Sequence, residues 1–185
     1  MQRGKTDIDR VLDFWFAAGM EERWFHATPA LDAEIRERFE PLWLQAAAGA
    51  LDGWRDDADG ALALAIVLDQ FPLNMYRGQA RSFATLPQAI AVTRHAVAQG
   101  LHRRLATTRV AFLYMPLMHS EDLVDQDESV RLFEAAGLVS NARFARHHRA
   151  LIERFGRFPH RNAILGRPSS EAENRYLASN EAFLG

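Results

Sequence analysis

The chain has 185 residues, a formal net charge of −2 and 48% hydrophobic residues, which is ordinary for a globular protein with a sizeable core. The small net charge gives no reason to expect nucleic acid or an anionic membrane as a partner. There is no cysteine, which excludes disulfides, thiolate chemistry and cysteine-based metal sites. We expect one domain over residues 1–185. We also expect a cytoplasmic location, because charges interrupt the apolar pattern of residues 1–16 and make it unlike a signal peptide.

Helix signals dominate the N-terminal half of the chain. Thr6 is predicted to cap the first helix, with Asp9 as its capping-box partner. Thr28 followed by Pro29 predicts the start of a second helix, and Pro41 predicts a kink or break within it. The apolar run 61–68 is predicted to be a buried helix rather than a strand, because alanine and leucine dominate it.

Proline and small polar residues mark further helix boundaries. Pro72 is expected to end the helix that contains residues 61–68, because proline cannot donate a backbone hydrogen bond. Thr85 is predicted to cap a helix over 86–99. A nearly all-apolar helix is then expected to end near Met118, with Ser120 capping its successor.

A long basic helix is predicted to begin at Ser140. Its inward face is expected to include Phe144 and His148, and its arginines, Arg143 among them, are expected to face solvent. With a last helix after Ser169 or Ser170, the chain holds about eight helices joined by short connections and no fixed repeat. The predicted fold is therefore all-α, an irregular stack of helical hairpins.

Two polar segments, each following an apolar helical run, are the best candidates for a site. They are LDQFPLNMYRG at residues 68–78 and RFGRFPHRN at residues 154–162. We expect the two segments to meet and form a cleft. Asp69 would then be either half of a buried ion pair that fixes helix docking, with Arg157 or Arg161 as partner, or the polar floor of a pocket.

The arginines near these segments lie at predicted helix ends and turns, where binding residues are common. Such guanidinium groups suit a carboxylate or a phosphate. They can equally bind the unpaired carbonyls that end a helix. Both interpretations stay open for Arg77, Arg157, Arg161 and Arg167.

The histidines suggest acid–base chemistry without establishing it. His119 is either a base oriented by a carboxylate or a residue favoured at a helix C-terminus. His148 lies among apolar neighbours and is expected to be a core residue. No metal-ligand spacing and no nucleotide-binding or hydrolase motif occurs in the sequence, so we expect no metal and no cofactor.

The order of VLDFWF, RWF, IRERF, LDQFPLNMYRG, FLYMPLMHSED, RFGRFPHRN and LGRPSS resembles an uncharacterised, mainly bacterial family. This family is catalogued as a domain of unknown function with a tetratricopeptide-like helical fold. The resemblance implies an all-α superhelix with no established activity. The family usually has arginine where this chain has Leu73. If that arginine contacts a ligand in relatives, this chain lacks the contact or binds something less acidic. Its polar positions correspond to Asp69, Gln70, Asn74, Arg77, His119, Glu121, Arg157, His160, Arg161 and Asn162.

Three functional hypotheses follow. The leading one is a binding module that holds a small acidic ligand or a carboxylate-bearing peptide at these ten residues, without a nucleic-acid or membrane partner. The second is an enzyme that uses His119 or His160 as acid or base with Asp69 or Glu121. The third is a structural scaffold in which the polar motifs only hold helices together.

Overall fold

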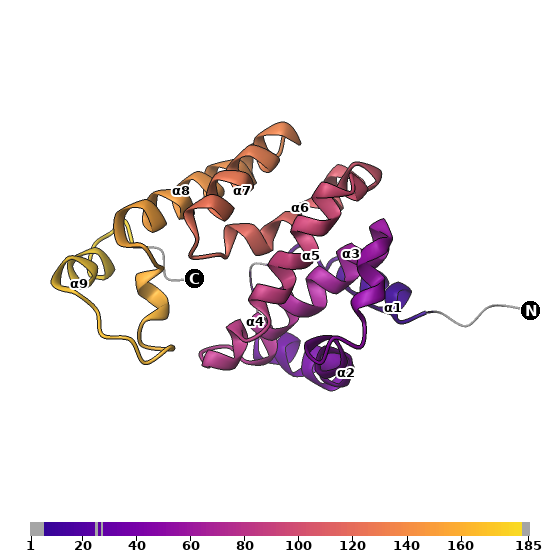
Figure 1. Cartoon of the computed structure of the whole chain (residues 1–185). Helices are drawn as coiled ribbons and strands as arrows, with labels where there is room; N and C mark the ends of the chain where they lie inside the picture. The colour runs from indigo at the N-terminus through magenta and orange to yellow at the C-terminus, as the bar shows by residue number, and fades with distance from the viewer. Residues whose placement is uncertain (1–5, 25, 27, 183–185) are drawn as a thin grey trace, which may run out of the picture. The chain divides into compact units, whose positions relative to one another are not determined.

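The computed structural model describes residues 6–24, 26 and 28–182, and within these residues it has helices and no strands (Figure 1). The α-helices are α1 (Asp7–Trp15), α2 (Pro29–Ala47), α3 (Ala58–Ala65), α4 (Phe71–Met75), α5 (Leu86–Ala98), α6 (Thr107–Met118), α7 (Leu123–Ala135), α8 (Val139–Phe155) and α9 (Glu171–Leu177). Short 3-10 turns are η1 (Asp52–Asp56), η3 (Ala80–Phe83), η4 (Leu101–Arg104) and η5 (Pro159–Arg161), and η2 (Ile66–Gln70) is a π-helical turn. The prediction of an all-α fold with about eight helices is confirmed. The tetratricopeptide-like superhelix stays a prediction.

The chain forms two compact units, each described here on its own. Unit 1 consists of the described residues up to Arg77 together with Arg81–Pro116. Unit 2 consists of Gly78–Ala80 and the described residues from Leu117 onward. The expectation of a single domain stays a prediction.

An aromatic core holds unit 1 together around the buried helix α3. This helix contacts α1, α5 and η1, and α2 contacts α4 (Figure 1). The rings of Phe39 and Phe71 stack with centroids 4.6 Å apart, and Trp15 meets Phe112 edge to face at 5.6 Å. Because residues 61–68 are all buried, the helix that carries them needs apolar side chains on every side, as their sequence predicts.

The helix starts predicted for α1 and α2 are confirmed. The Thr6 hydroxyl accepts from the Asp9 N–H while the Asp9 carboxylate accepts from the Thr6 N–H, so both halves of the capping box are present. The Thr28 hydroxyl accepts from the Leu31 N–H, with Pro29 at the first helical position. Of the kink or break expected at Pro41, the break was wrong, because α2 continues through it to Ala47, and the kink stays a prediction.

The helical path also continues through Pro72, so the predicted end there was wrong. After α3 the chain widens into the π-helical turn η2, in which the Phe71 N–H donates to the carbonyl of Ile66 five residues earlier, and α4 follows directly. Pro72 has no N–H for the carbonyl of Leu68, four residues back. The Thr85 hydroxyl donates to that carbonyl instead, at 2.5 Å.

Thr85 therefore serves a different purpose from the predicted one. It precedes α5 but makes no capping hydrogen bond to that helix. Its oxygen also accepts from the Trp43 indole N–H at 3.0 Å, and all three groups are buried. One hydroxyl thus connects α2, η2 and the start of α5.

In unit 2, α7 packs along α8 (Figure 1). The residue that caps α7 is Asp122, whose carboxylate accepts from the Val124 N–H, so the prediction of Ser120 as this cap was wrong. The Ser120 hydroxyl instead donates to the buried Asp125 carboxylate at 2.7 Å. The Gln126 amide donates to the carbonyls of Met118 and Ser120 at 2.8 and 2.6 Å, and so satisfies backbone groups left at the end of α6.

We predict that Gly60→Ala destabilises the protein. A Cβ at this position would lie 2.3 Å from the backbone carbonyl oxygen of Trp54, so the turn before α3 would have to move. We expect the free energy of unfolding, measured with urea, to fall by about 1–3 kcal/mol. Gly53→Ala is the matched control, because its Cβ would meet nothing within 4 Å. Equal stability of the two variants would contradict the packing described here.

We also predict that Thr85→Val destabilises unit 1. The change keeps the shape of the side chain but leaves the Leu68 carbonyl and the Trp43 N–H without their hydroxyl partner. The expected loss in free energy of unfolding is about 1–3 kcal/mol, the cost of an unsatisfied buried polar group. Thr108→Val, at an exposed position, should change stability by less than about 0.5 kcal/mol.

Candidate functional site

Four of the ten predicted site residues lie in unit 1. Asp69 and Gln70 are buried neighbours in η2, and the Gln70 amide donates to the Asp69 carboxylate at 2.6 Å. The Asn74 amide donates to the Gln70 carbonyl at 2.9 Å. The polar groups of this segment therefore bond to one another across successive helical turns.

Arg77, at the end of the same segment, pairs with a carboxylate of unit 1. Its guanidinium binds both oxygens of Asp32 on α2, at 3.0 and 3.2 Å, and also donates to the Asn74 side-chain oxygen at 3.1 Å. Arg77 itself is exposed, so the pair lies at the surface. Its geometry is that of a bidentate contact between helices.

The other six predicted residues lie in unit 2, and Arg157 is the first of them after α8. Gly156 ends α8 with a positive φ of 69°, which turns the chain so that Arg157 faces α9. The Arg157 guanidinium binds both oxygens of Glu173 at 2.7 and 2.8 Å and the Pro168 carbonyl at 2.9 Å. Glu173 is only 3% exposed. The hydrogen bonds from Arg157 outweigh burial and lower the pKa of Glu173 to about 2.

Glu121 is the second carboxylate that joins separate segments of unit 2. Its oxygens accept from the Phe158 N–H at 2.8 Å and from the two terminal nitrogens of Arg167 at 2.7 and 2.9 Å. Burial acts to raise the pKa of Glu121, but the hydrogen bonds from Arg167 and Phe158 outweigh it, so the pKa is lowered. Glu121 is therefore ionised and holds the segment after α8 against the segment before α7.

Asn162 and Arg161 complete this arrangement. The Asn162 amide donates to the Ser169 hydroxyl and its oxygen accepts from the Arg167 Nε, both at 3.0 Å. The buried Arg161 donates to the His119 carbonyl at 2.9 Å and lies over the Phe158 ring, 4.4 Å from its centroid. Arg161 thus binds a backbone carbonyl just after the end of α6, whereas Asn162 bonds to side chains of unit 2.

Phe158 also lies beside two histidines. Its ring centroid is 5.3 Å from that of His148 and 5.6 Å from that of His160. Burial lowers the pKa of His148 to about 3, although its hydrogen bond to the Phe144 carbonyl opposes the shift. Burial and the charge of Arg161 lower the pKa of His160 to about 4. Both imidazoles are therefore neutral at pH 7, and His148 is the buried residue that its apolar neighbours predicted.

The ten predicted residues thus divide between the two units. Asp69, Gln70, Asn74 and Arg77 belong to unit 1, and the other six residues belong to unit 2. The expected cleft between segments 68–78 and 154–162 therefore stays a prediction. Within unit 2, His119, Glu121, Arg157, His160, Arg161 and Asn162 do come together around Phe158 and the turn after α8.

Sequence reasoning missed the carboxylate partner of Arg157. Glu173 is not among the predicted site residues. The signal was present, because Ser170 and Glu173 have the spacing of a capping box, and this box exists in the structure. A carboxylate held beside a helix N-terminus is available to a neighbouring guanidinium.

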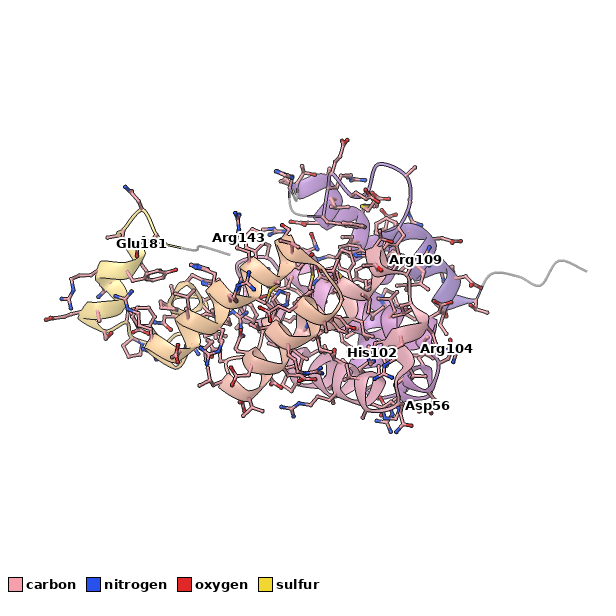
Figure 2. All side chains as sticks on the ribbon, turned by 90° about the horizontal axis from the view of Figure 1, so that it is seen from above. Asp56, His102, Arg104, Arg109, Arg143 and Glu181 are labelled. Atoms are coloured by element: carbon pink, nitrogen blue, oxygen red, sulfur yellow. The ribbon has the colours of Figure 1, made fainter. Side chains whose placement is uncertain are left out.

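A separate surface hollow lies in unit 2, with a volume of about 370 Å³. It is lined by Arg143, Phe144, His147, Glu181 and Ala182. Figure 2 labels Arg143, on α8, and Glu181, which follows α9. Phe144 was expected to face inward, which was wrong: its side chain is 43% exposed, and Ala145 and His148 take the buried positions.

Two negative observations concern the described residues alone. Over residues 6–24, 26 and 28–182, no helix combines the length and apolar character needed to cross a membrane. Over the same ranges, no group of three or more His, Asp or Glu side chains is arranged to hold a metal ion.

Comparison with known proteins gives a family and one solved fold. The model of the family described as "Bacterial protein of unknown function (DUF924)" matches residues 11–181. The solved structure of ATU0120 from Agrobacterium tumefaciens, titled a protein of unknown function, is 37% identical to this chain. The similarity covers 92% of this chain and 96% of that one, with a TM-score of 0.88. No curated protein matches the sequence.

We predict that stability falls as the pH is lowered from 6.5 towards 5. The unfolded chain protonates His148 and His160 near pH 6.5, whereas the folded protein does so only near pH 3 and 4, so acid favours unfolding in this interval. Each histidine contributes at most about 1.4 kcal/mol per pH unit to the slope. Urea unfolding at several pH values should therefore give a smaller slope for His148→Gln than for the wild type. Identical slopes would contradict this assignment.

Proposed function

This chain belongs to the bacterial DUF924 family of unknown function, and from its own contacts we propose that it is a non-catalytic helical scaffold. The observation that carries this proposal is the pairing of the motif arginines with carboxylates of the same unit. Arg157 binds Glu173 and Arg167 binds Glu121, each through two nitrogens and two oxygens. Such planar pairs fix the orientation of both partners.

The burial of Glu173 supports a structural role for Arg157. A carboxylate that is only 3% exposed needs a charged or hydrogen-bonding partner, because burial of an unpaired charge is costly. Arg157 supplies that partner and links the end of α8 to the first turn of α9. The segment 154–162 then functions as a clamp between helices of unit 2.

The same contacts weaken the enzyme hypothesis for Glu121. A general base needs oxygens that can reach the substrate proton. Both Glu121 oxygens accept hydrogen bonds, from Arg167 and from the Phe158 N–H, and the lowered pKa reduces the basicity of the group. A role in holding the chain explains these bonds without invoking a substrate.

Binding of an acidic ligand or peptide at the ten motif residues stays a prediction. The pairing of Arg157 with Glu173 and of Arg77 with Asp32 favours structural roles for these two guanidiniums. A cytoplasmic location and the absence of a nucleic-acid partner also stay predictions.

We predict that Arg157→Ala lowers the free energy of unfolding, because it leaves the buried Glu173 carboxylate without its guanidinium partner. For a chain of this length the melting temperature should fall by roughly 5–10 °C. Arg157→Lys should lose less, since it keeps the charge but not the bidentate geometry. The matched control is Arg146→Ala, whose pair with Glu134 is half exposed on both sides and should contribute less than about 1 kcal/mol.

A thermal-shift screen against anionic metabolites distinguishes the scaffold from a binding site at the motif. The scaffold predicts that any stabilisation by a metabolite is the same for the wild type and for folded Arg157→Lys. A stabilisation that is present in the wild type and disappears in Arg157→Lys would overturn the scaffold assignment and place a ligand on Arg157.

A further inference from the structure

Two side chains of opposite charge line the hollow on unit 2 without forming an ion pair with a described residue. Arg143 and Glu181 both line it, yet neither forms an ion pair with the other or with another described residue. The Arg143 guanidinium lies over the Phe144 ring, 5.6 Å from its centroid. The backbone N–H of Glu181 donates to the Ser179 hydroxyl, and Glu181 is exposed.

We propose that this hollow binds a free α-amino acid with an apolar side chain. Such a molecule carries one carboxylate, one ammonium group and one apolar group, and the hollow offers a complement to each. The inference goes beyond the scaffold proposal and does not rest on it, because the motif arginines are absent from the lining of the hollow.

Arg143 is suited to the ligand carboxylate. Its planar guanidinium can donate two parallel hydrogen bonds to a carboxylate. Contact with the Phe144 ring restrains the side chain before a ligand arrives, which reduces the entropy lost on binding. His147 lines the same hollow.

Glu181 decides between an amino acid and a simple acid. A carboxylate on the wall of the hollow repels a ligand that is only negative, whereas it attracts an ammonium group. Among the described residues of the lining, one guanidinium and one carboxylate therefore match a zwitterion better than a phosphate or a dicarboxylate. This distinguishes the hollow from the acidic-ligand site expected at the motif.

Phe144 and Ala182 supply the apolar part of the lining. Phe144 is 43% exposed, and other large apolar residues of unit 2 are exposed to different degrees. Covering this ring with an apolar side chain removes it from water, which favours binding. The volume of about 370 Å³ lies at the lower end of the range for small-molecule sites, about 300–1,000 Å³.

The test is calorimetric titration of the full chain with L-phenylalanine, N-acetyl-L-phenylalanine and L-phenylalaninamide. The second compound lacks the ammonium charge, and the third lacks the carboxylate. We expect Arg143→Gln and Glu181→Gln each to weaken L-phenylalanine binding by about three- to tenfold. Both positions are exposed, so these variants should fold. Arg146→Gln, on the same helix but outside the hollow, is the matched control and should bind as the wild type does.

The two analogues make the assignment of each charge specific. If the proposal is right, Glu181→Gln does not weaken binding of the N-acetyl compound, and Arg143→Gln does not weaken binding of the amide. Absence of L-phenylalanine binding to the wild type up to about 10 mM, which is weaker than roughly −3 kcal/mol, would overturn the proposal. So would equal binding by the wild type, Arg143→Gln and Glu181→Gln.

Discussion

The buried carboxylate of Glu173 is the constraint on which the C-terminal part of unit 2 depends. It accepts from Arg157 and, through the capping box, from the backbone of Ser170, so one charge joins the end of α8 to the start of α9. Glu121 does the same between the turn after α8 and the segment before α7. Two ionised carboxylates thus help to hold the helices of this unit together. The apolar cluster of Leu151, Ile152, Phe158 and Tyr176 contributes as well.

The second constraint on the structure comes from backbone carbonyls that have no N–H partner within a helix. Each of them needs another hydrogen-bond donor. In unit 1, the Thr85 hydroxyl binds the carbonyl that faces Pro72. In unit 2, Gln126, Arg161 and Arg157 donate to carbonyls at helix ends and in connections. These donors lie 8 to 42 residues along the chain from their acceptors, so satisfying the backbone carbonyls also joins separate segments of the chain.

Local signals account for what could be predicted from the sequence. The caps at Thr6 and Thr28 involve residues three apart, and the buried character of residues 61–68 follows from composition. The path through Pro72 and the role of Thr85 depend on hydrogen bonds between residues 17 and 42 positions apart along the chain, which periodicity does not reveal. For the candidate site, the polar residues of unit 2 could be identified from the sequence, but Glu173 could not be identified as the partner of Arg157. The sequence therefore could not decide whether these polar residues bind a ligand or hold helices together.

The π-helical turn Ile66–Gln70 has a consequence for how this chain tolerates length changes. Such a turn holds one residue more than an α-helical turn, so removing one of its five residues would let α3 run into α4 as a regular helix. Because the wide turn absorbs the extra residue locally, side chains after the deletion would keep nearly the same orientation about the helix axis relative to α3. The same deletion inside a regular α-helix would instead rotate every later side chain by about 100°. The π-helical turn is therefore the place on this helical path where one residue can be lost while Phe71 stays stacked on Phe39.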